Sequence, residues 1–296
     1  MENSSVQTTD IGIIGGSGLY DMPGLRETRE QRLETPFGAP SEIIVTGRVD
    51  GIAVAFLARH GRGHRLLPSE VPYRANIYAM KMLGVQYLLS FSAVGSLRED
   101  LRPLDMVVPN QFIDLTRRRD STFFGKGAVA HVSMAEPVCA VVAGVLTRAC
   151  ATALPTNAVR IHGGGTYICI EGPQFSTRAE SLWYRSIGAD VIGMTNLPEA
   201  KLAREAQIAY ATLAMVTDYD CWHPREANVT ADLALANLRK NAENAQQIAA
   251  TAIRILGAER PVSSAHSALA SALVTRPQDM APEVRARLAA ILPPIS

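Results

Sequence analysis

The chain has 296 residues, of which 47% are hydrophobic and 19% are charged, with 29 Lys and Arg against 28 Asp and Glu. This length can bury the core of one large α/β domain or of two smaller ones, and the hydrophobic fraction excludes a chain that is disordered throughout. The net charge of +1 provides no global electrostatic reason to bind nucleic acid or an anionic membrane.

The first third of the chain contains apolar runs that predict short strands and one helix. The strand candidates end at glycine or at the hairpin sequence Asp50-Gly51, and the helix candidate begins at proline and ends at glycine. In chain order we expect strands over 11–14, 41–46 and 52–58, a helix over 72–84 and a strand over 85–91.

The later elements continue this alternation. Thr177 and Glu180 form the sequence pattern of a capping box, which predicts the start of a helix. Apolar residues between 238 and 256 recur at steps of three and four, as is typical of a helix with one face on the core. We expect a helix over 177–188, a strand over 190–193, a helix from Pro198, a strand over 210–217 and a long helix from near Thr230.

Strands that alternate with helices predict a three-layer α/β/α sandwich, and the early hairpin makes a mixed sheet more consistent than a purely parallel one. No internal repeat and no linker rich in proline or serine divides the chain, so we expect a single domain. Within it we expect residues 1–10 to form a flexible N-terminus, 11–257 the main folded domain and 258–296 a C-terminal tail with a peripheral helix.

The chain shows no sequence feature of export. Its cysteines stand far apart, which supports neither a zinc knuckle nor a disulfide framework. The first ten residues lack the basic and apolar regions of a signal peptide, and no uncharged apolar run reaches the roughly 18 residues that span a bilayer. We therefore expect a cytoplasmic protein.

Two polar clusters follow early strands, at the positions where open α/β sheets bind ligands. In residues 15–18 (GGSG), backbone N–H groups and the Ser17 hydroxyl can hold a phosphate, with a plain strand-to-loop turn as an equal alternative. Their spacing fits neither a dinucleotide fingerprint nor a Walker loop. Residues 59–64 (RHGRGH) contain two arginines and two histidines, which favours an anion-binding loop over a solvated basic loop.

Two further clusters lie at later strand ends. Residues 90–96 carry small hydroxyl side chains, which on their own are a weak signal. Asp218 and Asp220 could hold the edge of a heterocyclic base, one sharing a proton with a ring nitrogen and the other accepting from an exocyclic amine. The alternative is a solvated Asx turn. We interpret the run Arg117-Arg118-Arg119 as a solvated loop face, with contact to a partner subunit as the alternative.

These clusters and their order resemble the S-methyl-5′-thioadenosine phosphorylases, in the trimeric branch of the purine nucleoside phosphorylases. The resemblance covers about residues 11–257 and rests on IGIIGGSGLYD, ETPFGAPS, LARHGRGH, AVGSLRED, QFIDLT, MAEP, IEGPQFSTRAES, GMTNLPEA and ATLAMVTDYDCW. It implies an α/β/α sandwich around a mixed, partly barrel-like sheet and a homotrimer. It also implies that inorganic phosphate cleaves the N-glycosidic bond of methylthioadenosine, with no metal or organic cofactor.

The resemblance also implies roles for individual residues. The phosphate site comprises Ser17, Arg59, His60, Ser92, the Ala93 backbone and Thr195. The nucleoside site comprises Met194 beneath the ribose, Asp218, Tyr219 and Asp220 at the base, and Phe175 and Ile170 as walls of the base pocket. Ser176 lies where relatives tune base preference, and Ala231 lies in the region that faces the 5′ substituent. Asp218 and Asp220 are the expected catalytic residues, with a protonated Asp218 acting on N7 of the leaving adenine.

Alternative functions remain open from the sequence. Paired aspartates suit a 6-aminopurine, whereas a phosphorylase for methylthioinosine or ordinary purine nucleosides is the nearest rival. A hydrolytic nucleosidase would not need Arg59 and His60 to bind phosphate. The glycine spacing disfavours a dinucleotide-binding oxidoreductase, and a non-catalytic nucleoside-binding protein is a further alternative.

Overall fold

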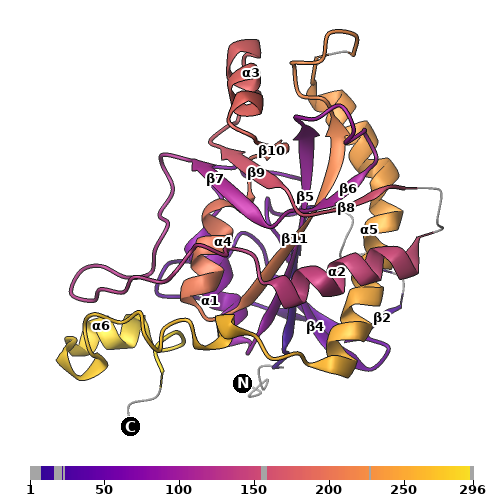
Figure 1. Cartoon of the computed structure of the whole chain (residues 1–296). Helices are drawn as coiled ribbons and strands as arrows, with labels where there is room; N and C mark the ends of the chain where they lie inside the picture. The colour runs from indigo at the N-terminus through magenta and orange to yellow at the C-terminus, as the bar shows by residue number, and fades with distance from the viewer. Residues whose placement is uncertain (1–7, 17–21, 23, 155–158, 227, 294–296) are drawn as a thin grey trace.

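The computed structural model of the chain describes residues 8–16, 22, 24–154, 159–226 and 228–293. Within these residues an eleven-stranded mixed sheet lies between two layers of helices (Figure 1). The strands are β1 (Ile11–Gly15), β2 (Leu25–Gln31), β3 (Ile44–Val49), β4 (Ile52–Ala58), β5 (Tyr87–Ser96), β6 (Met106–Val108), β7 (Gln111–Leu115), β8 (Ile161–Gly163), β9 (Thr166–Ile170), β10 (Val191–Gly193) and β11 (Ala209–Asp218). The helices are α1 (Tyr73–Met82), α2 (Ala140–Ala153), α3 (Arg178–Ser186), α4 (Asn196–Glu205), α5 (Ala231–Glu259) and α6 (Pro282–Arg287).

The sheet is organised around β5. One branch runs in the order β2-β3-β4-β1-β5-β10-β9-β7, and a second leads from β5 through β11 and β6 to β8, so the sheet does not close. Strands β4, β1, β5 and β11 are mutually parallel, and their near-continuous apolar runs are buried, as expected for strands covered on both faces. The carboxyl ends of these strands therefore lie at the same edge.

The two faces of the sheet carry separate hydrophobic layers. Helices α1 and α4 contribute residues such as Ile77 and Leu202 to one layer, and α2 and α5 contribute residues such as Val142 and Ile248 to the other. Figure 1 shows these two pairs of helices on opposite sides of the central strands. The predicted α/β/α sandwich with a mixed sheet is confirmed.

Local signals account for several boundaries. Asp50 and Gly51 have φ angles of 49° and 80°, the left-handed conformations that a tight hairpin between β3 and β4 requires. The capping box is present at α3, because the Thr177 side chain accepts the Glu180 N–H and the Glu180 side chain accepts the Thr177 N–H. Helix α5 begins after its N-cap Thr230, as predicted.

Other elements differ from the sequence expectations. Strand β5 continues to Ser96, so the hydroxyl cluster at 90–96 lies within the strand and not after it. The sequence does not predict the polar edge strand β2 or the short strands β6 to β9, because none of them shows a clear alternation of apolar and polar residues. Helix α2 has no side-chain hydrogen bond at its N-cap, which removes the usual sequence signal for its start.

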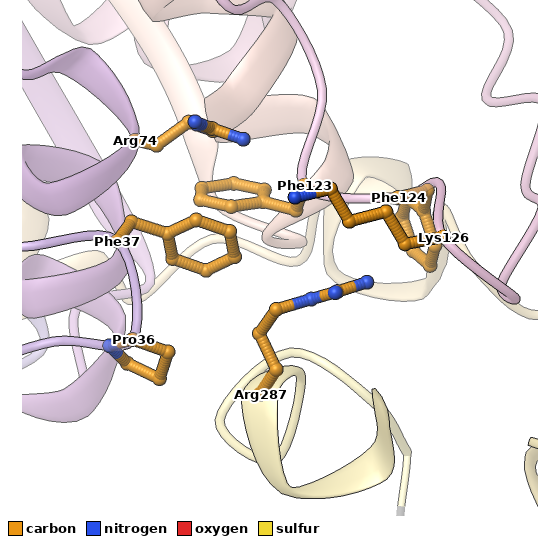
Figure 2. A pocket seen from close by; sticks show the side chains of 7 residues that line it. All are labelled: Pro36, Phe37, Arg74, Phe123, Phe124, Lys126 and Arg287. Atoms are coloured by element: carbon orange, nitrogen blue, oxygen red, sulfur yellow. The ribbon is translucent and has the colours of Figure 1, made fainter. Parts of the chain in front are cut away.

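The segment after α5 packs along the α1–α4 layer and ends in α6. Together with α1 and two loops, α6 borders an open cavity of about 300 Å³ lined by Pro36, Phe37, Arg74, Phe123, Phe124, Lys126 and Arg287 (Figure 2). None of the residues expected at the site lines this cavity. Among the helices that the structure describes, none is long and apolar enough to cross a membrane.

Candidate functional site

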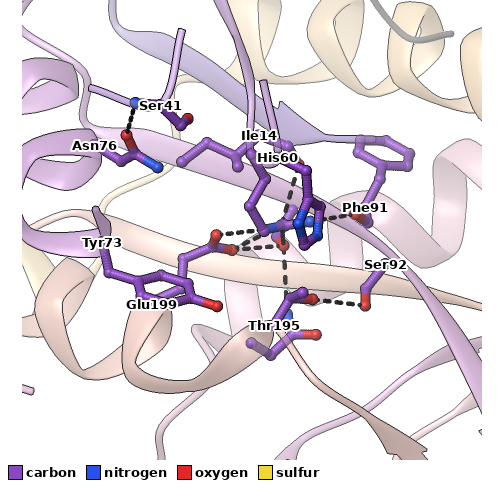
Figure 3. A network of polar contacts seen from close by, with 12 residues as sticks. Ile14, Ser41, His60, Tyr73, Asn76, Phe91, Ser92, Thr195 and Glu199 are labelled. Carbon is purple, nitrogen blue, oxygen red and sulfur yellow. Dashed lines mark hydrogen bonds and ion pairs between the residues drawn. The ribbon is translucent and has the colours of Figure 1, made fainter. Parts of the chain in front are cut away.

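A buried ion pair lies at the carboxyl edge of the parallel strands. Arg59, the residue after β4, and Glu199, on α4, are 2% and 1% exposed. The Nε of Arg59 donates to Glu199 Oε2 at 2.7 Å, and its Nη2 donates to Oε1 at 3.0 Å (Figure 3). The hydroxyls of Ser90 and Tyr210 also donate to this carboxylate, at 2.8 and 3.0 Å. A paired and hydrogen-bonded charge of this kind is the form in which ions persist in a protein interior.

The remaining contacts of Arg59 fix its orientation. Nη1 donates to the Phe91 carbonyl at 3.0 Å and Nη2 to the Ser90 hydroxyl at 2.7 Å. Burial lowers the pKa of Arg59, but the charge and hydrogen bonds of Glu199 outweigh it and the net shift is upward. A guanidinium has five N–H groups, so within the described contacts one Nη1 hydrogen remains to donate to a ligand.

The neighbouring His60 is a neutral imidazole. Burial, followed by the charge of Arg59, lowers the pKa of His60 to about 4. Its Nδ1 lies 2.9 Å from the Leu66 carbonyl oxygen, which can only accept, so Nδ1 carries the hydrogen. Nε2 then presents a lone pair, which can accept a hydrogen bond from a ligand hydroxyl such as that of hydrogen phosphate.

Two hydroxyl groups lie close together beside Arg59 and His60. Ser92 Oγ on β5 lies 3.0 Å from Thr195 Oγ1, which follows β10, and both residues are buried (Figure 3). Ser92 Oγ is also 3.3 Å from the Tyr167 hydroxyl on β9. Ala93, the next residue of β5, is partly exposed. Fixed hydroxyl donors beside a buried guanidinium suit an oxyanion.

Asp218 and Asp220 lie at the end of β11, and both are buried. Asp218 Oδ1 accepts the Asp220 N–H at 2.8 Å, and the Thr217 hydroxyl donates to Asp218 Oδ2 at 2.7 Å. Burial raises the pKa of Asp218 to about 6. The two hydrogen bonds lower this pKa and the Asp220 charge raises it, but burial is the largest effect. Burial also raises the pKa of Asp220, which adopts a left-handed φ of 52°. Asp218 is therefore partly protonated near neutral pH.

Close backbone approach explains two glycines at the site. A Cβ on Gly95 would lie 2.9 Å from Asp218 Oδ1, so a side chain on β5 here would displace this carboxyl. A Cβ on Gly172, which has a φ of +66°, would lie 2.5 Å from the Met194 sulfur. Residues 92–95 of β5 thus connect the hydroxyl pair to Asp218, and Met194 packs against the loop after β9.

The other expected residues are distributed around this edge. Ile170 is buried at the end of β9, whereas Phe175, just beyond it, is 43% exposed. The carbonyl of Ser176 accepts the Cys221 thiol, and Tyr219 stacks on His223 with ring centroids 4.7 Å apart. Ala231 is exposed at the start of α5. Ser17 lies outside the described residues.

Sequence reasoning missed Glu199 and misjudged Arg119. Glu199 occupies a polar-looking helix, and only the fold shows that it faces the core beside Arg59. The interpretation of Arg117 to Arg119 as a solvated face is wrong for Arg119, whose side chain is 1% exposed. It is inserted between the loop after β9 and the segment after β10, where backbone carbonyls accept its hydrogen bonds.

Comparisons with known proteins identify relatives across almost the whole chain. The profile described as the phosphorylase superfamily matches residues 10–254. S-methyl-5′-thioadenosine phosphorylase from Thermosynechococcus vestitus is 60% identical over 275 residues, which cover 93% of this chain and 94% of that protein. The crystal structure of a methylthioadenosine phosphorylase from an Antarctic soil metagenomic library has a TM-score of 0.93 and 62% identity, covering 97% of this chain and 100% of that chain. A serine-to-threonine variant of adenosine/methylthioadenosine phosphorylase from Schistosoma mansoni, in complex with methylthioadenosine, has a TM-score of 0.76 and 40% identity, covering 85% and 93%.

The buried ion pair yields a stability prediction. Glu199→Gln keeps the size of the side chain but leaves the Arg59 charge buried without its counter-ion, which should lower the free energy of unfolding by about 3–5 kcal/mol. Urea unfolding followed by circular dichroism measures this change. Glu259→Gln, which removes the exposed partner of Arg148, is the matched control and should leave the midpoint nearly unchanged. Equal shifts in the two variants would contradict the structural role of the buried pair.

Proposed function

The chain belongs to the phosphorylase superfamily, and from this membership and the geometry of the site we infer that it cleaves S-methyl-5′-thioadenosine with inorganic phosphate. The products are adenine and 5-methylthioribose 1-phosphate. The inference depends on one observation. The groups suited to an oxyanion, Arg59 and the paired hydroxyls, and the partly protonated Asp218 all lie beside one short stretch of β5. Relatives named for this substrate, and one bound to it, support the choice of nucleoside.

The proposed phosphate site consists of Arg59, His60, Ser92, the Ala93 backbone, Thr195 and Ser17. Its support is the remaining Nη1 hydrogen of Arg59, the lone pair on His60 Nε2 and the paired hydroxyls of Ser92 and Thr195. Ser17 is included on the resemblance alone. The site holds the phosphate beneath the sugar, so that its oxygen is positioned to bond to the anomeric carbon.

The proposed base site uses Asp218 and Asp220. As the bond between the anomeric carbon and N9 breaks, its electron pair passes to the purine, and Asp218 donates its proton to N7. A phosphate oxygen forms the new bond to the anomeric carbon, and the phosphate charge stabilises the cationic sugar in the transition state. Asp220 accepts a hydrogen bond from the exocyclic amine. The burial that raises the pKa of Asp218 to about 6 supports its role as the acid.

Further residues complete the proposed substrate site. Met194 lies beneath the ribose, Ile170 and Phe175 form walls of the base pocket, and Tyr219 lies at the base with Asp218 and Asp220. Ser176 tunes the choice of base, and Ala231 faces the 5′ substituent. Support for Met194 comes from its contact with Gly172, which fixes it against the loop that carries Phe175.

We further propose a cytoplasmic homotrimer that requires phosphate as co-substrate and no metal or organic cofactor. The support for assembly is the apolar surface near the site: Phe175, Leu182, Trp183 and Ile187, on and beside α3, are each at least 43% exposed. Large apolar side chains exposed together on and beside one short helix are typical of surfaces covered by a partner.

Phosphorolysis of methylthioinosine or of ordinary purine nucleosides is the alternative. The two buried aspartates disfavour a 6-oxopurine, because an ionised Asp220 would face the carbonyl oxygen of that base and not an amine donor.

The reaction is tested by adenine release from methylthioadenosine, measured with and without inorganic phosphate, with methylthioinosine and adenosine in parallel. We expect release that depends on phosphate and is fastest from methylthioadenosine. Release without phosphate would make the enzyme a hydrolase, and a preference for methylthioinosine would contradict the roles of the two aspartates.

The pH dependence tests the role of Asp218. Because the acid form is active, kcat/KM for the nucleoside should fall as pH rises through the pKa of Asp218, about 6 in the free protein. Bound phosphate favours the protonated carboxyl and moves this fall to higher pH. At pH values below this fall the enzyme stays active until other groups titrate.

Asp218→Asn should lower kcat by about 10²–10⁴-fold and abolish this dependence, with little change in phosphate affinity, because a carboxamide has no acidic proton to transfer. Steady-state kinetics and phosphate titration calorimetry measure both quantities. Asp279→Asn, an exposed aspartate paired with Arg276, is the control and should behave as wild type. Near-normal turnover in Asp218→Asn would remove Asp218 from the mechanism.

A further inference from the structure

Arg119 is the most extensively bonded side chain next to the proposed site that the proposed reaction does not use. Its side chain is 1% exposed, and its Nε donates to Glu171 Oε1 at 3.0 Å. Nη1 donates to the Tyr73 hydroxyl at 3.0 Å. The other acceptors are backbone carbonyl oxygens: Met194 at 2.6 Å and Leu197 at 2.7 Å from Nη1, and Glu171 at 2.7 Å and Ile170 at 3.4 Å from Nη2. The two hydrogens of Nη1 are shared among its three acceptors.

These carbonyls belong to two segments that carry different halves of the proposed site. Met194 and Leu197 flank Thr195, in the segment that leaves β10 and enters α4. Ile170 and Glu171 lie at the end of β9, immediately before the loop that carries Phe175. One planar guanidinium therefore connects the phosphate and ribose side of the site to the wall of the base pocket.

The loop around Arg119 is built to direct this side chain inward. The Glu171 carboxylate accepts the backbone N–H groups of Arg117 and Arg118 as well as the Arg119 Nε–H. Arg117 and Arg118 themselves are exposed. The guanidinium lies over the Tyr73 ring with 5.3 Å between its carbon and the ring centroid. The neighbouring arginines thus share the sequence context of Arg119 but not its position.

The chemistry of the contacts requires arginine. The carbonyl acceptors lie on two sides of the side chain, and a rigid fork of N–H donors can reach both sets at once. A lysine ammonium is a compact point charge with three donors and cannot span them. The single carboxylate of Glu171 pairs with the charge, and the carbonyl dipoles provide the remaining stabilisation.

We propose that Arg119 is a positioning residue that holds the Met194–Thr195 segment and the end of β9 at the separation required for phosphate to attack the ribose. This inference rests on the proposed phosphorolysis. Without the guanidinium, Thr195 and Met194 lose their fixed distance from the base-pocket wall. A displacement of the reacting groups by about 1 Å can lower the rate by about 10²-fold, because the bound substrates no longer meet in the reactive geometry.

The test compares Arg119→Ala and Arg119→Lys with Arg118→Ala, the exposed neighbour, and with wild type. Circular dichroism and thermal unfolding establish the folded fraction of each variant. Steady-state kinetics with methylthioadenosine and phosphate give kcat and both KM values per folded molecule. The Arg119→Ala assay is repeated with millimolar guanidinium chloride, which can occupy the vacated position, and wild type with the same salt is the control.

We expect folded Arg119→Ala to lose about 10²-fold in kcat and to show a raised KM for phosphate. Guanidinium should restore part of this loss, whereas Arg119→Lys should remain impaired and Arg118→Ala should match wild type. If Arg119→Ala does not fold, Arg119→Lys decides the question by the same kinetic criteria.

The inference is overturned if the folded variant keeps kcat within about threefold of wild type. It is also overturned if the unfolded fraction accounts for the whole loss, with an unchanged KM for phosphate and no effect of guanidinium. Absence of phosphorolysis in both wild type and Arg118→Ala would instead refute the proposed function.

Discussion

The Arg59–Glu199 ion pair is the interaction on which the rest of the site depends. It joins the end of β4 to α4, and through Ser90 and Tyr210 it also joins β5 and β11. A charge buried this deeply is tolerated only because its partner and surrounding donors and acceptors are all fixed. The fold therefore presents a guanidinium at a set position at the carboxyl edge of the sheet, with Ser92 and Thr195 beside it.

Burial shifts the pKa values in the two halves of the site in opposite directions. It lowers the pKa of His60 to about 4, so that this ring is neutral beside the guanidinium. It raises the pKa of Asp218 to about 6, so that a fraction of this carboxyl is still protonated near neutral pH. The Arg59 charge and the paired hydroxyls suit one half to hold an anion, and the protonated fraction of Asp218 suits the other to donate a proton, as phosphorolysis of a purine nucleoside requires. The division follows from desolvation and from the position of one buried cation.

Local sequence patterns predict the parts of this structure that local physics determines. The Asp50-Gly51 hairpin, the capping box at Thr177 and the buried face of α5 depend on neighbours along the chain, and each is present in the structure. Arg59 and Asp218 are recognisable because they lie at the ends of apolar strands. Glu199 and Arg119 are not, because a charged residue in a polar helix or in a run of arginines usually faces solvent. Only the tertiary contacts show that these two side chains point inward.

The most direct test of this account is a crystal structure of the protein with inorganic phosphate and adenine bound. The account predicts phosphate oxygens within hydrogen-bond distance of Ser92 Oγ, Thr195 Oγ1 and His60 Nε2, with Arg59 still paired to Glu199 and adenine N7 facing Asp218. Phosphate bound instead in the cavity lined by Arg74, Lys126 and Arg287, with the edge of β5 left empty, would contradict it.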